Sequence, residues 1–316
     1  MYDFPDYATM RQKIGELFGQ QKFEDAGAIL KWALKEFPDH LGANVFNLAF
    51  MQVQINQPEK AIETLQYGLD HDVWFGPFEL GIDVWAPVKE MDAFKQIQAR
   101  CEEFREQAQK LAKPELVVVP PKDYDPSQKY PLFIALHGGG ETVETFKPQW
   151  SSPKLESEFI VAYPQSSRVI SMNGFSWTGE PPDRQEIVDV YQAVCDEYNV
   201  DSDQILMGGF SAGGHLTLTL LLDEKQVVPM RGFIVLCPPV PEGYTSEAIA
   251  RIAERGQRGV LLTTEMDNRV EDQRELAAAF QEGRVPLQFE VTSNIGHWYP
   301  PDLAEKIDDG IEFILS

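Results

Sequence analysis

The sequence contains a serine with a glycine two positions before it and another two positions after it, between two apolar runs. The segment Gly209-Phe210-Ser211-Ala212-Gly213 follows the apolar run at residues 204–207 and precedes the run at 216–222. This pattern predicts a strand, a sharp turn and a helix, with Ser211 at the apex. Small residues on both sides permit a strained turn that lifts the hydroxyl toward a pocket. The motif predicts a nucleophilic serine; the alternative is a glycine-rich turn that only packs closely.

A second glycine-rich turn, His137-Gly138-Gly139-Gly140, follows the apolar run at residues 130–136, which we expect to be a buried strand. A turn of this type supplies backbone N–H groups that stabilise the negative oxygen of a tetrahedral intermediate. We expect the N–H groups of Gly139, Gly140 and Ala212 to form this oxyanion hole. An ordinary glycine turn is the alternative.

A carboxylate is expected just past a later strand. Residues 259–264 form the predicted strand, and the loop that follows begins Glu265-Met266-Asp267. Asp267 is the candidate acid because it lies three residues beyond the strand end, and Glu265 is the alternative. Its place in the chain order is what favours Asp267.

A histidine is the third candidate catalytic residue, after the serine and the acid. After the predicted strand at 287–291, a loop containing His297 precedes the helix predicted over 303–314. Of the five histidines, His297 is the one in a loop after both Ser211 and the candidate acid. The order serine, acid, histidine is that of an α/β-hydrolase catalytic triad.

Residues from about 114 to 316 resemble an α/β-hydrolase. They are most similar to its esterases of the phospholipase/carboxylesterase and poly(3-hydroxybutyrate) depolymerase-like groups. The segment at 209–214 is typical of their nucleophile turn, and Gly296-His297 followed by Pro300 resembles their histidine loop. The His-Gly pair that these groups often place before the acid is missing at residues 264–267. The resemblance implies an α/β-hydrolase fold with a mostly parallel sheet, preceded here by a smaller all-helical domain.

The resemblance also implies a serine carboxylesterase that acts through an acyl-enzyme. We expect small neutral carboxylic esters as substrates, because nothing in the sequence indicates an acidic or basic specificity group. His297 would accept the proton of Ser211, and Asp267 would fix the imidazole tautomer. No metal or organic cofactor is needed. Aromatic side chains, Trp177 and Trp298, are expected at the substrate-binding pocket.

Two other functions compete with the esterase. A serine peptidase resembling the prolyl oligopeptidase group shares the fold and the triad order. Those enzymes often carry a bulky aromatic residue where Ala212 stands here, and a β-propeller rather than a helical N-terminal region. The second competing function is that of a non-enzymatic interaction protein built on a hydrolase fold. Acyl transfer to an acceptor other than water is not separable from hydrolysis by sequence.

Composition narrows the class of protein. A chain of 316 residues exceeds what one compact core usually holds, which favours two domains. The net charge of −23 disfavours nucleic acid or an anionic membrane surface as a partner. We expect no membrane span, because no apolar run approaches roughly 18–20 residues, and no signal peptide. The three cysteines favour a reducing cytoplasm over a disulfide framework.

The first part of the chain has helical patterning. Ala26 and Ala61 stand 35 positions apart, as do Leu30 and Leu65. An alanine and a leucine four residues later lie on one helical face. The spacing is near the tetratricopeptide repeat of about 34 residues. Residues 1–112 are therefore identified as a tetratricopeptide-like domain, with a generic helical bundle as the alternative, and residues 113–316 as the catalytic domain.

The helical domain could bind a partner, and one of its segments could lie against the hydrolase domain. It is a candidate surface for a homo-oligomer or a protein partner. The aromatic, proline-broken segment at residues 74–87 is expected either to pack the helical domain on the hydrolase or to act as a partial lid.

Overall fold

The computed structural model describes residues 2–316, and their internal contacts divide them into two compact units. One unit holds the residues up to Leu111 together with Ile170–Met172. The other holds Ala112–Val169 and Asn173–Ser316.

The N-terminal unit is built from helices, with α2 packed on α3 and α3 on α4. Its helices are α1 (Tyr7–Gly19), α2 (Phe23–Glu36), η1 (Pro38–His40), α3 (Leu41–Gln54), α4 (Pro58–Leu69), α5 (Pro77–Gly81), η2 (Asp83–Trp85) and α6 (Asp92–Leu111). The repeated residues occupy α2 and α4, where Ala26, Ala61, Leu30 and Leu65 are all fully buried. The repeat therefore marks the buried faces of these two helices, and its likeness to tetratricopeptide repeats stays a prediction.

The second unit is organised around a seven-stranded sheet in the order β1-β3-β2-β6-β7-β8-β9. Its strands are β1 (Glu115–Val119), β2 (Tyr130–Leu136), β3 (Ile160–Gln165), β6 (Val200–Phe210), β7 (Gly232–Leu236), β8 (Arg258–Thr264) and β9 (Leu287–Thr292). Strand β1 pairs antiparallel with β3, and the other neighbouring pairs are parallel. The short strands β4 (Val169–Ser171) and β5 (Gly174–Phe175) form a separate pair.

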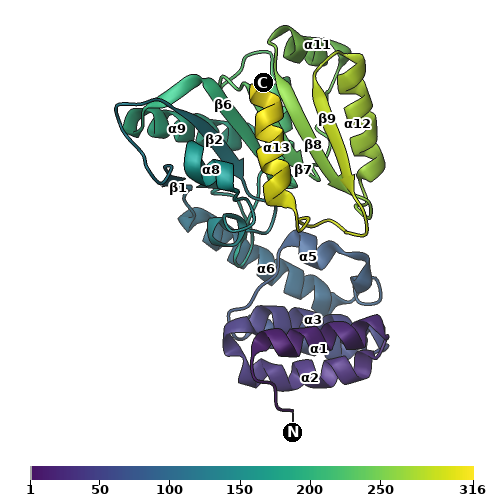
Figure 1. Cartoon of the computed structure of the whole chain (residues 1–316). Helices are drawn as coiled ribbons and strands as arrows, with labels where there is room; N and C mark the ends of the chain where they lie inside the picture. Colours follow the sequence, from purple (N-terminus) through teal and green to yellow (C-terminus); the bar gives the residue numbers. More distant parts are fainter. Residues whose placement is uncertain (1) are drawn as a thin grey trace. The chain divides into compact units, whose positions relative to one another are not determined.

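Helices cover both faces of this sheet, as Figure 1 shows for the yellow helix α13 lying across the central strands. They are α7 (Val143–Phe146), α8 (Pro153–Glu158), α9 (Pro181–Glu197), α10 (Ala212–Leu222), α11 (Ser246–Glu254), α12 (Val270–Glu282) and α13 (Leu303–Leu315). One core joins the sheet to α9, α10, α11 and α12, and the other joins it to α7, α8 and α13. Parallel sheets are typically buried on both faces in this way, which explains the continuous apolar runs of β2 and β7.

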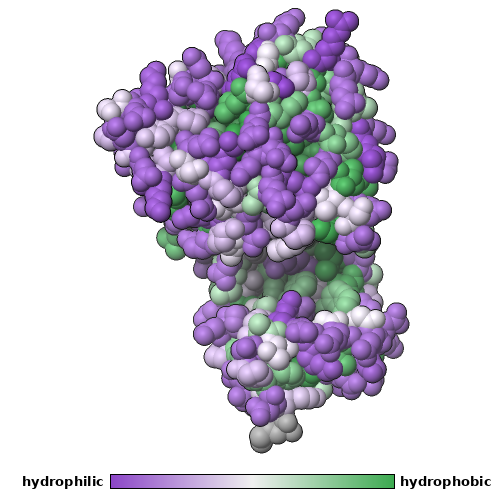
Figure 2. Space-filling model, viewed as in Figure 1, coloured by the Kyte–Doolittle hydropathy of each residue, from purple (hydrophilic) through white to green (hydrophobic). Residues whose placement is uncertain are grey.

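The predicted fold class, a mostly parallel α/β sheet preceded by a smaller helical region, is confirmed. Hydrophilic side chains cover most of each unit on the face in Figure 2, in keeping with the high charge. Within residues 2–316, no helix has both the length and the apolar character needed to cross a membrane.

Candidate active site

Ser211 lies in the turn between β6 and α10. Its backbone has φ 49° and ψ −112°. Residues other than glycine rarely adopt a positive φ of this kind. A Cβ added at Gly209 or at Gly213 would lie 2.2 Å from the backbone oxygen of Leu136. The two glycines are therefore required by the close approach of the turn to β2, and that approach holds Ser211 in its strained conformation.

The structure brings the three predicted triad residues together. Oγ of Ser211 lies 2.8 Å from Nε2 of His297. Nδ1 of the same ring lies 2.6 Å from Oδ2 of Asp267. The loop that carries the histidine is held to the end of β8, because the Thr264 hydroxyl donates a 2.8 Å hydrogen bond to the backbone oxygen of Gly296.

Asp267 is the acid in contact with the histidine, and its side chain is buried. Burial alone raises the pKa of Asp267, but hydrogen bonds from His297 and from the Arg269 N–H outweigh it and leave the pKa below its usual value of 3.8. The carboxylate is thus ionised at neutral pH. An ionised Oδ2 accepts a hydrogen bond from Nδ1–H, which keeps the proton on Nδ1, so Nε2 is free to accept the proton of Ser211. Glu265, the alternative acid, instead accepts a hydrogen bond from the Asn294 N–H.

Gly139 and Ala212 lie side by side. A Cβ on Gly139 would lie 3.8 Å from Cβ of Ala212 and 3.1 Å from Oγ of Ser176. Across the described part of the chain, residues 2–316, neither the N–H of Gly139 nor that of Ala212 donates a hydrogen bond.

Gly140 differs from the expectation. Its N–H donates a 2.8 Å hydrogen bond to the backbone oxygen of Phe175, because Glu141 and Phe175 form an isolated antiparallel bridge. A donor engaged in that bridge is not free to bind an oxyanion. Of the three N–H groups expected to form the oxyanion hole, those of Gly139 and Ala212 have no acceptor within residues 2–316.

His137, the first residue of the same turn, is fully buried. Nδ1 lies 2.7 Å from the backbone oxygen of Gly138, and Nε2 accepts a hydrogen bond from the Ser166 N–H. Burial lowers the pKa of His137 from 6.5 to about 4, so the ring is neutral at pH 7. The side chain acts as a fixed support for the glycine turn.

The two tryptophans expected to bind substrate lie in different environments. Trp177 is 3% exposed and belongs to the core on the α9–α10 face of the sheet. Trp298 is 58% exposed and follows His297 directly. Its ring meets Phe210 edge-to-face, with ring centroids 6.4 Å apart. Burial favours a packing role for Trp177, whereas Trp298 offers an apolar surface beside the triad.

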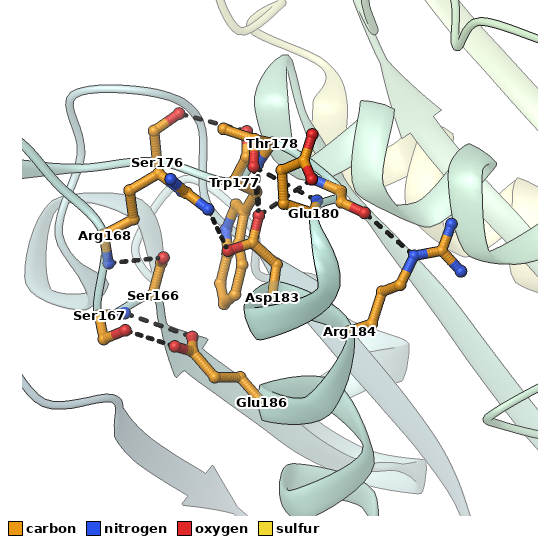
Figure 3. A network of polar contacts seen from close by, with 11 residues as sticks. Ser166, Ser167, Arg168, Ser176, Trp177, Thr178, Glu180, Asp183, Arg184 and Glu186 are labelled. Carbon is orange, nitrogen blue, oxygen red and sulfur yellow. Dashed lines mark hydrogen bonds and ion pairs between the residues drawn. The ribbon is translucent and has the colours of Figure 1, made fainter.

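The segment beside the glycine turn is held by a polar network that the sequence patterns did not indicate (Figure 3). Asp183 is 1% exposed and accepts hydrogen bonds from the N–H groups of Thr178 and Gly179, at 2.5 and 3.0 Å. It also pairs with the guanidinium of Arg168 at 3.4 Å. This network holds in place the segment that contains Ser176, and Ser176 lies next to Gly139.

One group of side chains has the composition of a metal site. Ligand atoms of Cys237, Asp267 and His297 lie within 4.8 Å of one another. A metal ion there would have to replace the hydrogen bond between the carboxylate and the imidazole. Burial also raises the pKa of Cys237 to about 12, which keeps the thiol protonated and a poor ligand. The residues therefore fit a proton-transfer site better than a metal centre.

No family model matches the chain, and no curated protein matches its sequence. Solved structures do match. An uncharacterized protein from Bacillus cereus ATCC 10987 is 22% identical, with a TM-score of 0.55 over 98% of this chain and 98% of that one. Esterase 2 from Thermogutta terrifontis, phosphoramylated by tabun, is 16% identical, with a TM-score of 0.50 over 64% of this chain and 89% of that one. With the sheet order and the turn at Ser211, this likeness shows that the second unit has the α/β-hydrolase fold.

Proposed function

We propose that this chain is a serine hydrolase that cleaves small neutral carboxylic esters. The observation that carries the proposal is the continuous hydrogen-bond chain from Ser211 through His297 to Asp267. The proposed nucleophile, base and orienting acid are in hydrogen-bond contact, which is the geometric requirement for activating a serine hydroxyl.

The proposed reaction follows from these contacts. Oγ of Ser211 attacks the ester carbonyl carbon as Nε2 of His297 takes its proton. The carbonyl oxygen becomes negative and accepts hydrogen bonds from the N–H groups of Gly139 and Ala212. The imidazolium then protonates the leaving alcohol, and the acyl group remains on Ser211. Water, deprotonated by the same imidazole, attacks the acyl-enzyme and releases the acid.

The comparison with the Thermogutta terrifontis protein adds support at the level of fold. That protein is an esterase and is phosphoramylated by tabun. Phosphylation by such compounds is a reaction of an activated nucleophile, and we propose the same reactivity for Ser211.

The preference for neutral, apolar esters rests on the surroundings of the triad. Met266 and Trp298 directly adjoin Asp267 and His297 in the chain, and both have largely exposed apolar side chains. The net charge of −23 disfavours an anionic substrate. We propose that the acyl group or the alcohol of the substrate packs against these two side chains.

The test is release of p-nitrophenol from acetate, butyrate and octanoate esters. We expect turnover by the wild type, its loss in Ser211→Ala, and full turnover in Ser157→Ala, whose exposed serine lies on α8. Equal turnover in Ser211→Ala and wild type would contradict the proposal. Turnover of peptide p-nitroanilides without ester turnover would instead favour the peptidase alternative.

A further inference from the structure

Glu141 directly follows the glycine turn, and its carboxylate has two partners from distant parts of the chain. It accepts a hydrogen bond of 2.6 Å from the N–H of Gly138. It also accepts one from the hydroxyl of Tyr299, which lies 2.8 Å from both carboxylate oxygens although 158 positions separate the two residues. The carboxylate therefore joins the glycine turn to the histidine loop.

Tyr299, one partner of Glu141, is linked to His297 through the ring of Phe210. Tyr299 is two residues past His297, and its ring packs on that of Phe210 with centroids 4.4 Å apart. The His297 ring packs on the same phenylalanine at 4.9 Å. Phe210 directly precedes Ser211. The positions of Tyr299 and of the triad are thus linked through one aromatic ring.

The glycine turn needs such a restraint. Gly138 and Gly139 have no side chains that limit their backbone dihedrals, so the direction of the Gly139 N–H depends on contacts made by the turn. A Cβ at Gly138 would lie 2.6 Å from the Phe210 ring and 2.7 Å from the Glu141 carboxylate, so the turn is pressed between these two groups. The hydrogen bond to Glu141 fixes the peptide between His137 and Gly138, which is the neighbour of the peptide that carries the Gly139 N–H.

We propose that Glu141 is a positioning residue that aligns the oxyanion donor at Gly139 with the His297 loop. It acts through Gly138 and Tyr299 and does not touch the substrate. This inference rests on the proposed function, because the alignment matters only if an oxyanion forms at the site.

An ionised carboxyl suits this role because it accepts on both oxygens and donates on neither. Burial raises the pKa of Glu141, whereas hydrogen bonds from Tyr299 and Gly138 and the nearby charge of His297 favour the ionised form. A glutamine there keeps one acceptor and turns N–H donors toward an existing donor. Glu141→Gln therefore preserves the shape of the side chain but prevents it from accepting hydrogen bonds from Gly138 and Tyr299 at the same time.

The test compares Glu141→Gln and Tyr299→Phe with wild type, using p-nitrophenyl acetate. We expect kcat of Glu141→Gln to fall by about 10–100-fold with little change in KM, because the loss is in transition-state alignment. Tyr299→Phe should lose less, since the bond to Gly138 remains. The double variant should be no slower than Glu141→Gln, because both changes break one linkage.

Glu144→Gln, an exposed carboxylate on α7, is the matched control and should retain wild-type kcat. Unchanged kcat in Glu141→Gln, or a rise in KM alone, would overturn the role of Glu141. Should Glu141→Gln fail to fold, unchanged kcat in Tyr299→Phe would overturn it equally. Absence of serine-dependent turnover in the wild type would refute the proposed function itself, and the alignment role with it.

Discussion

Nδ1 of His297 lies 2.6 Å from Oδ2 of Asp267, and the aspartate residue is only 3% exposed. The second oxygen of this carboxylate accepts a 2.8 Å hydrogen bond from the Arg269 N–H. A carboxylate held on both oxygens has one orientation, so it fixes the imidazole in the tautomer that presents a bare Nε2 to Ser211.

Asp267→Asn tests this relationship. The amide can donate to Nδ1 and so favour the tautomer that carries its proton on Nε2, which cannot accept the proton of Ser211. We expect kcat for p-nitrophenyl acetate to fall by about 10⁴-fold with KM little changed. Glu265→Gln, which changes the alternative acid, should lose little. A large loss in Glu265→Gln beside a small one in Asp267→Asn would show that the acid is assigned wrongly.

Gly213→Ala tests the close approach at the nucleophile turn. The added Cβ would lie 2.2 Å from the Leu136 oxygen and 2.7 Å from the His137 oxygen, both backbone atoms that cannot move alone. We expect thermal denaturation at a clearly lower temperature, with a loss of about 1–3 kcal/mol. Gly15→Ala in α1 is the control, because its Cβ meets nothing within 4 Å; it should stabilise by about 1 kcal/mol. Thermal denaturation of Gly213→Ala and wild type at the same temperature would refute the close packing.

Asp183→Ala tests the network in Figure 3. The substitution leaves the N–H groups of Thr178 and Gly179 and the guanidinium of Arg168 without this acceptor. We expect a loss of about 3–5 kcal/mol in the free energy of unfolding, measured by urea denaturation. Asp189→Ala, at an exposed position on the same helix, should change it by less than about 0.5 kcal/mol. Similar losses in the two variants would show that the network does not hold the segment.

His137 makes stability depend on pH. Because burial lowers its pKa to about 4, the unfolded chain takes up the proton first as the pH falls. The contribution of His137 is fully present above pH 6.5 and is lost between about pH 6.5 and pH 4, amounting to about 3 kcal/mol. Urea denaturation at several pH values should show a shallower dependence in His137→Gln than in wild type. An equally steep dependence in both would contradict the assignment.

Part of the fold was predictable because several strands contain apolar runs, and β2 and β6 lead into glycine-bearing turns. Strand β2 begins and ends at the residues expected from sequence, and α13 differs from expectation by one residue at its end. The edge strand β1 and the short β4–β5 pair were not predicted. Short strands of this kind depend on a neighbouring strand to pair with, which a local pattern does not reveal.

The site was predictable only where chain order carried information. Ser211, Asp267 and His297 follow strand ends, and the carboxyl ends of parallel strands converge at one edge of a sheet. The direction of the Gly140 N–H depends on its bridge partner Phe175, so the sequence could not exclude this donor. Glu141 went unnoticed because its partner Tyr299 is distant in sequence. Its one local signal is its place directly after the glycine turn.

The central claim is that Ser211 is an activated nucleophile, and covalent labelling tests it most directly. Wild type and Ser211→Ala would be incubated with a fluorophosphonate probe, digested and analysed by mass spectrometry. The account predicts a single adduct on Ser211 in the wild type, no adduct in Ser211→Ala, and much slower labelling in His297→Ala. An adduct on another residue, or equal labelling of wild type and Ser211→Ala, would contradict it.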